Sequence, residues 1–318
     1  MAIAQNAVEA IRAFHPTDVV LQYTSQMWDA WRFGSPAAAW LAAQLRRSGV
    51  RTVLIAHELY VPWRARPDLS AAALSQRLLF GALLKTYDRV LVTTSTRAAL
   101  IAPYCRLLRV APPEILRVGP NVIPIRSSPE RNRARSSKIG LFSTAAAGKR
   151  FDVVLDAFQR IALELPASEL VLMGDLGSPD QPRVRKILQD IAQHPAKDRI
   201  RTTGRLSLEE LAREISDLDL YLFPMDTGAN TRSGTLPAAL GSGIPTVAIN
   251  GVDTDLTLFR DGETLSFAEN MSGAAFAEAS LRLLRNPALA NGIGEGGRRL
   301  YETHLSWERS ADQLLADT

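Results

Sequence analysis

The stretch from Leu218 to Ile249, LDLYLFPMDTGANTRSGTLPAALGSGIPTVAI, decides the fold of this chain. It opens with an apolar run that stops at Pro224 and continues into a loop rich in glycine and hydroxyl side chains. A helix-like segment follows at 235–240, and after GSG the chain returns to an apolar run at 245–249. Two short apolar runs joined through a loop and a helix are typical of a βαβ unit with parallel strands.

The same alternation extends toward the amino terminus from this stretch. Ser207 and Glu210 have the spacing of a capping box, which predicts the start of a helix. Strands that alternate with helices in this way predict an open parallel sheet with helices on both faces. The expected strands are 138–142, 169–173, 199–204, 218–223 and 245–249, and the expected helices are 149–163, 183–192, 207–215 and 235–240.

The first half of the chain shows a looser version of this pattern. Helices are expected to start at the Ser35-Pro36 pair and near Ser70. Short β-branched runs of the kind that fill a parallel sheet predict four strands. These expected strands are 19–23, 52–57, 89–94 and 114–118.

A polar and strongly basic stretch, 127–137, has no apolar period and is typical of a linker. It separates the two alternating patterns. We therefore predict an α/β protein of two doubly wound Rossmann-like domains, with the first domain at 1–126 and the second at 138–318.

The composition describes an ordinary globular protein, because 46% of the 318 residues are hydrophobic. No apolar run approaches the roughly 20 residues that a membrane helix needs. The single cysteine, Cys105, excludes an intramolecular disulfide and fits a reducing cytosol. The four histidines are scattered, without metal-ligand spacing. We expect a cytoplasmic protein without a zinc site.

The two halves differ sharply in charge. Residues 1–137 hold 18 Lys and Arg against 8 Asp and Glu, whereas the remaining residues hold 19 against 25. Such asymmetry indicates an anionic partner for the first half, which could be a phosphorylated or lipid-linked substrate, a membrane surface or nucleic acid. A solvated, arginine-rich surface is the alternative. Nucleic acid is the weaker choice, because no recognised binding motif accompanies the charge.

The loop after the expected strand 218–223 has the features of an anion site. In a doubly wound sheet the ligand lies outside the carboxyl ends of the strands, where loops enter helix amino termini. Glycine allows close backbone approach, and hydroxyl and guanidinium groups can donate hydrogen bonds. The loop supplies Gly228, Thr231, Arg232, Ser233, Gly234 and Thr235.

Several separate signatures in the second half share their order and spacing with one family. They are IGLFSTAAAGKRFDVVLDAF, LVLMGDLG, RIRTTGRLSLEELAREISDLDLYLFP and TLPAALGSGIPTVAI. Residues 138–310 thereby resemble the carboxy-terminal domain of the retaining GT-B glycosyltransferases related to sucrose synthase, mannosyltransferases and glycogen synthase. The resemblance implies that this domain binds a nucleotide-sugar donor.

Individual site residues follow from this resemblance. Lys149 matches the family lysine that neutralises the donor diphosphate, and Arg205 and Leu206 match the loop that meets the base. Ser233, Gly234 and Thr235 would present N–H and hydroxyl groups to the phosphates, beside Thr231.

The sequence also departs from the family pattern. The family arginine falls on Thr144. Two family glutamates, one touching the transferred sugar and one the ribose, fall on Asn230 and Ala238, and an alanine cannot accept a bond from ribose. Arg232 could supply the missing positive charge from another direction. The alternative is that donor binding has been lost.

The first half resembles the acceptor-side domain more loosely. His57 and Glu58 follow an expected strand, where related enzymes keep a histidine near the transferred sugar; His57 could bind the sugar or acceptor, and Glu58 could orient the acceptor hydroxyl. The alternative is that His57 is a structural histidine, hydrogen-bonded within the core or a cap. Nothing in the sequence matches the family's first strands, so we expect a reduced, amino-terminally shortened domain.

The implied function is retaining glycosyl transfer from a nucleotide-sugar to a sugar or lipid-linked acceptor in bacterial polysaccharide or glycoconjugate synthesis, without metal or cofactor. The aromatic and basic segments 28–33 and 61–66 would form a lid or contact an anionic membrane at its inner face, and we favour the lid. The alternatives are a non-catalytic GT-B-like scaffold or partner subunit, and an epimerase on the same fold.

Overall fold

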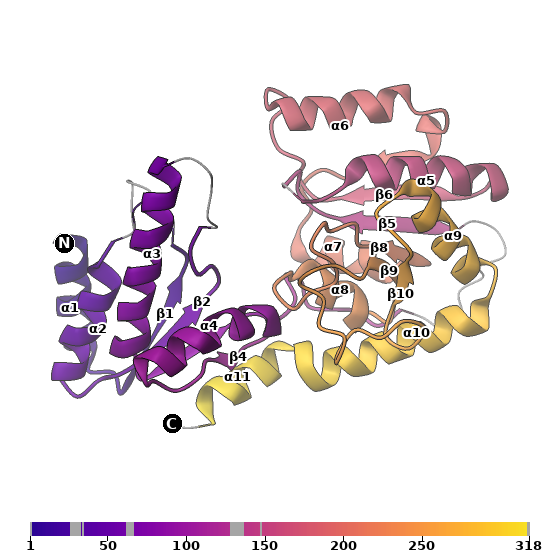
Figure 1. Cartoon of the computed structure of the whole chain (residues 1–318). Helices are drawn as coiled ribbons and strands as arrows, with labels where there is room; N and C mark the ends of the chain where they lie inside the picture. The colour runs from indigo at the N-terminus through magenta and orange to yellow at the C-terminus, as the bar shows by residue number, and fades with distance from the viewer. Residues whose placement is uncertain are drawn as a thin grey trace. The chain divides into compact units, whose positions relative to one another are not determined.

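The computed structural model describes residues 2–25, 33, 35–61, 67–127, 137–146 and 148–316. The chain divides into two compact units, Met1–Arg117 and Val118–Thr318 (Figure 1). Each unit contains one parallel sheet with its own helices. The predicted parallel α/β architecture is therefore confirmed.

The first unit is built around a four-stranded parallel sheet with the order β1-β2-β3-β4. All four expected strands are confirmed, although β4 is only two residues long. The order runs in one direction, so this sheet has no reversal among its described strands. The elements are α1 (Ala2–Phe14), β1 (Asp18–Tyr23), α2 (Ala37–Arg47), β2 (Arg51–Ala56), α3 (Pro67–Thr86), β3 (Arg89–Val92), α4 (Ser95–Leu108) and β4 (Glu114–Ile115).

The core of the first unit lies between the sheet and the helices α2, α3 and α4. Tyr23, Leu54 and Phe80 are buried together in this layer. On β1 the side chains alternate, because Val20 is 46% exposed while Tyr23 is buried. This strand lies at one edge of the sheet.

The second unit contains a six-stranded parallel sheet with the order β10-β9-β8-β5-β6-β7. Counted from β5, this is the 3-2-1-4-5-6 order of a doubly wound sheet, and the order reverses between β5 and β8. The elements are β5 (Lys138–Phe142), α5 (Phe151–Glu164), β6 (Glu169–Met173), α6 (Pro182–Gln193), η1 (Lys197–Arg199), β7 (Ile200–Thr202), α7 (Leu208–Ser216), β8 (Leu220–Leu222), α8 (Thr235–Gly241), β9 (Thr246–Ile249), β10 (Ser266–Ala268), α9 (Gly273–Leu284), α10 (Pro287–Leu300), the π-helix η2 (Tyr301–Leu305) and α11 (Trp307–Leu315).

Two hydrophobic layers cover the two faces of this sheet. Along β6, Leu170 and Leu172 are buried with α5 and α9, whereas Val171 and Met173 are buried with α7 and α8. Successive side chains of a strand point to opposite faces, so a central strand with helices on both sides is apolar throughout. The helices thus fix the sheet and hold its carboxyl ends in place.

The division between the units comes before the predicted linker, at Arg117 and Val118 rather than after residue 126. The segment that follows is hydrogen-bonded to the second unit, since the amides of Val118, Asn121 and Ser127 donate to backbone carbonyls there at 2.9 Å. These bonds attach 118–127 to the second unit. Most of the predicted linker, residues 128–136, lies outside the described residues.

Candidate functional site

The loops after β5 and β8 meet where the strand order of the second unit reverses. The Arg150 amide donates to the Pro224 carbonyl at 3.0 Å, and the Asp226 amide donates to the Gly148 carbonyl at 2.9 Å. Lys149 forms an isolated antiparallel bridge with Met225 between these two bonds. The backbone of Lys149 is therefore fixed at the position where doubly wound sheets bind their ligands.

The side chain of Lys149 is buried without a partner. It is 5% exposed, and among the described residues its Nζ has no hydrogen-bond acceptor. The Nζ lies 4.2 Å from the centroid of the buried Phe223 ring, which offers the ammonium a cation–π contact. Burial lowers the pKa of Lys149 to about 8. A buried charge without a counter-ion is unfavourable, so an anion brought to this place would satisfy it.

Asn230 shapes the loop after β8 from within. Its Nδ2 donates to the Gly228 carbonyl at 2.9 Å and to the Thr227 Oγ1 at 3.2 Å, and its Oδ1 accepts from the Arg232 amide at 3.2 Å. Asn230 and Thr231 are both 2% exposed. The Asn230 amide is therefore used for loop structure, whereas the sequence suggested a contact with the transferred sugar.

The start of α8 packs against another segment of the same unit. A Cβ on Gly234 would lie 2.0 Å from the Asn121 Oδ1, so only glycine fits there without a shift. The hydroxyls of Ser233 and Thr235 lie 3.0 Å apart, and Thr235 is buried. Asn121 is thus the group that packs closely against the backbone of Gly234.

The remaining predicted donor residues lie on separate loops of the second unit. Thr144 and Arg232 are exposed on the loops after β5 and β8, on either side of the order reversal. Arg205 is exposed and Leu206 is half-buried after β7, which is separated from β5 by β6. Of these residues, Arg232 belongs to the loop that contacts Lys149.

Sequence reasoning missed Arg183, which begins α6. Its Nη2 donates to the Lys149 carbonyl at 2.5 Å, so it joins α6 to the loop after β5. No motif singled out this arginine. The signal that could have found it is the first turn of α6, which holds basic side chains and no acidic one.

His57 and Glu58 follow β2 in the first unit, as predicted. The His57 amide donates to the Tyr23 carbonyl at 2.9 Å, and the His57 Nε2 is hydrogen-bonded to the Gln22 Oε1. Because this oxygen only accepts, the Nε2 donates in this hydrogen bond. Glu58 is half-buried. Gln22, at the end of β1, is a second residue that the sequence did not suggest.

Two predicted features concern residues that are not described. Residues 26–32 and 62–66, which carry most of the expected lid or membrane segments, lie outside the described residues. Within the described ranges, no helix combines the length and apolarity that crossing a bilayer requires. The same ranges contain no group of three or more His, Cys, Asp or Glu side chains arranged to hold a metal ion.

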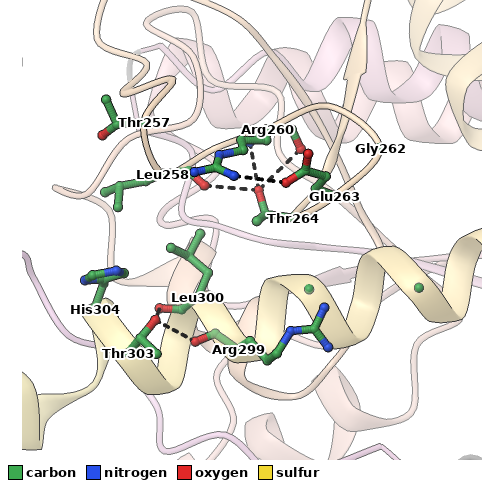
Figure 2. A pocket seen from close by; sticks show the side chains of 12 residues that line it. Thr257, Leu258, Arg260, Gly262, Glu263, Thr264, Arg299, Leu300, Thr303 and His304 are labelled. Atoms are coloured by element: carbon green, nitrogen blue, oxygen red, sulfur yellow. Dashed lines mark hydrogen bonds and ion pairs between the residues drawn. The ribbon is translucent and has the colours of Figure 1, made fainter.

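A separate cavity of about 470 Å³ opens between α10, η2 and residues 257–264 of the second unit (Figure 2). Its polar side chains are largely occupied. Arg260 pairs with Glu263 at 3.2 Å, and the hydroxyls of Thr264 and Thr303 bond to backbone carbonyls. The lining contains none of the predicted donor residues, so this cavity is distinct from the Lys149 site.

One known protein family matches most of the second unit. Residues 137–286 match the family described as Glycosyl transferases group 1. No curated protein matches the sequence. The match covers the sheet from β5 to β10 and therefore contains Lys149, Arg183 and the loop after β8.

Solved structures resemble the whole chain. A sucrose-phosphate synthase from Thermosynechococcus elongatus gives a TM-score of 0.68 at 20% identity, with 99% of this chain and 79% of that chain covered. The Anabaena protein HepE in complex with UDP and glucose gives 0.72 at 13% identity, covering 99% and 80%. A glycosyltransferase from Rickettsia africae ESF-5 gives 0.73 at 14% identity, covering 99% and 79%. The predicted resemblance to GT-B glycosyltransferases and the two-unit GT-B fold are confirmed.

Proposed function

We propose that this chain, which combines the GT-B fold with a glycosyl transferases group 1 match in its second unit, transfers a sugar from a nucleotide-sugar to an acceptor hydroxyl. The observation that carries the proposal is the buried Lys149 ammonium, which has no hydrogen-bond acceptor among the described residues and belongs to the loop at the order reversal. Doubly wound sheets bind the pyrophosphate of a nucleotide at this edge.

The proposed role of Lys149 is electrostatic. As the sugar leaves, negative charge develops on the nucleoside diphosphate, and a fixed cation in a dry site stabilises that charge. The bound anion would in turn favour the protonated lysine and raise its pKa from about 8 toward the ordinary value. Arg205 and Arg232, both exposed on separate loops of the second unit, would contribute further positive charge, and Thr231, Ser233 and Thr235 would contribute hydroxyl groups.

The finer features of the reaction rest on the family resemblance. Transfer would retain the anomeric configuration, with the donor phosphate accepting the proton of the incoming hydroxyl. Lysine, arginine and backbone N–H groups would hold the diphosphate in place of a metal ion, and no cofactor would be needed. We propose UDP as the first nucleotide to test, because HepE is described with UDP and glucose and pneumococcal GtfA with UDP and GlcNAc.

The proposed acceptor is a sugar or a lipid-linked sugar in bacterial polysaccharide or glycoconjugate synthesis. His57, hydrogen-bonded to Gln22, would contact the sugar or the acceptor, and Glu58 would orient the acceptor hydroxyl. The basic first half would favour a cytoplasmic location at the inner face of an anionic membrane.

A second candidate is a scaffold or partner subunit that kept the fold and lost catalysis. Two observations favour it. Ala238, fully buried in α8, stands where the family has a ribose-binding glutamate, and the Asn230 amide is occupied within its own loop. A protein of this kind would bind no nucleotide.

Isothermal titration with UDP, GDP, ADP and dTDP separates the two candidates. The transferase proposal expects one nucleotide to bind to the wild type and to bind about 100-fold more weakly to Lys149→Met, since a charge-assisted interaction is lost. Lys197→Met, which removes an exposed lysine of the same unit, should bind like the wild type. No binding of any of the four nucleotides would favour the scaffold.

A further inference from the structure

Arg183 connects α6 to the backbone of the loop that carries Lys149. It is the second residue of α6, which follows β6, and β6 pairs directly with β5. The Arg183 Nη2 donates to the Lys149 carbonyl at 2.5 Å, and the same carbonyl accepts from the Phe151 amide at 3.2 Å. Hydrogen bonds from a charged donor are shorter and stronger than neutral ones. Arg183 therefore fixes the peptide group next to the buried ammonium.

The position of Lys149 needs such a constraint. An ammonium that is buried without an acceptor gains free energy by turning out to water, and a lysine side chain is flexible enough to do so. The cation–π contact with Phe223 opposes this only modestly. Holding the Lys149 carbonyl restrains the backbone torsions of this residue, and this limits the directions in which its side chain can leave the order reversal.

The presence of arginine at this place is not explained by the helix. The amino terminus of a helix carries partial positive charge and favours acidic side chains in its first turn. The first turn of α6 has no acidic residue, and Arg183, Arg185 and Lys186 follow Pro182 in sequence. Such a local conflict is expected where a residue serves a site.

We propose that Arg183 is a positioning residue for Lys149, which holds the buried ammonium ready for the diphosphate of the donor. The proposal rests on the proposed donor site and adds a residue to it. Arg183 acts through the Lys149 carbonyl, so its contribution to ligand affinity depends on the lysine side chain.

Arg185 provides a matched control on the same helix. Its Nη2 donates to the Asp180 carbonyl at 3.3 Å, within the loop that precedes α6, so it makes a similar bond away from Lys149. Arg183→Gln should weaken UDP binding about tenfold in titration calorimetry, whereas Arg185→Gln should stay within about twofold of the wild type. Arg183→Lys, which keeps the positive charge and a hydrogen-bond donor group, should restore part of the loss. Equal affinity of Arg183→Gln and the wild type would overturn the proposal.

A double-mutant cycle distinguishes positioning from direct contact with the ligand. If Arg183 acts through Lys149, then Arg183→Gln combined with Lys149→Met should bind UDP no more weakly than Lys149→Met alone. Additive losses would mean that Arg183 binds the anion independently, and the positioning role would be wrong.

A measurement without ligand separates this proposal from the proposed function. Acetic anhydride labelling followed by mass spectrometry reports the accessibility of each lysine, with the exposed Lys186 and Lys197 as references. Lys149 should label faster in Arg183→Gln than in the wild type or in Arg185→Gln. If the wild type bound none of the nucleotides, the proposed function would fail. Faster labelling of Lys149 in Arg183→Gln would still establish that Arg183 positions Lys149. Unchanged labelling of Lys149 would overturn the positioning role of Arg183.

Discussion

The two units differ in whether the candidate site residue at the carboxyl ends of their strands has a hydrogen-bond partner. In the second unit the order reverses between β5 and β8, and the buried ammonium of Lys149 has no acceptor among the described residues. In the first unit the order runs in one direction, and the His57 ring is already hydrogen-bonded to Gln22. An unsatisfied buried charge calls for an external partner, whereas a satisfied imidazole does not.

This difference assigns different tasks to the two units. The second unit should carry the affinity for an anion, because its lysine gains most from one. The first unit should orient a neutral group, because its candidate residue His57 already has a hydrogen-bond partner in Gln22. Each of the following changes tests one side of this contrast.

Lys149→Met should produce the largest effect on the ligand-free chain. It removes the unpaired charge and keeps an unbranched side chain of similar size. We expect the free energy of unfolding to rise by about 2 to 3 kcal/mol at pH 7, because burial lowers the lysine pKa from 10.5 to about 8. Urea denaturation followed by circular dichroism measures the change.

The stability gain from Lys149→Met should decrease as the pH rises. Between pH 8 and 10.5 the unfolded chain binds more protons at Lys149 than the folded chain, so wild-type stability rises with pH across this window. The advantage of Lys149→Met should be complete below about pH 8 and disappear above pH 10.5. Lys197→Met, at an exposed site, should show neither effect. A Lys149→Met protein less stable than the wild type at pH 7 would mean that the ammonium has an acceptor in solution.

His57→Ala tests the other side of the contrast. Loss of one hydrogen bond to the sugar or acceptor should lower the transfer rate about tenfold, while the affinity for UDP stays within about twofold of the wild type. Initial rates with a UDP-sugar and calorimetry with UDP measure the two quantities. A parallel loss of UDP affinity would place anion binding in the first unit as well and remove the contrast.

Proton uptake should accompany UDP binding to the second unit. With Lys149 titrating near pH 8, the wild-type affinity should be about tenfold lower at pH 9 than at pH 7, because most of the free protein then lacks the charge. Calorimetry at both pH values, in buffers of different ionisation enthalpy, measures the affinity and the proton count. Lys149→Met controls for titration of the ligand and should show no uptake from the lysine.

The architecture of the second unit was predictable because its central strands are largely apolar and are separated by helical segments. The expected strands 138–142 and 169–173 match β5 and β6 residue for residue. The strand β10 was missed, since a run of three residues, Ser266–Ala268, gives no periodic signal. The unit boundary was also misplaced, because 118–127 joins the second unit through backbone bonds that leave no mark in composition.

The candidate site was predictable only in part. The resemblance to the GT-B glycosyltransferases pointed to Lys149, and the strand order then explains its position. Arg183 and Gln22 act through contacts with residues 34 and 35 positions away, so neither belongs to a local motif. Asn230 was assigned by alignment to the sugar, but its side chain is used to shape its own loop. Roles that depend on tertiary neighbours rather than on local spacing were the ones that sequence could not supply.

Phe223→Leu should give the smallest effect and tests what surrounds the ammonium of Lys149. The ring face, 4.2 Å from the Nζ, favours the charged form by about 0.5 to 1 kcal/mol, so its loss should lower the lysine pKa by roughly half a unit. The pH at which UDP affinity begins to fall should shift downward by the same amount, as measured by calorimetry between pH 6.5 and 9. Phe276→Leu shortens another fully buried phenylalanine of the second unit and should destabilise the fold without moving this pH. If both variants left the pH dependence unchanged, the Phe223 ring would contribute only packing. Burial alone would then set the pKa of the lysine whose unsatisfied charge distinguishes the second unit from the first.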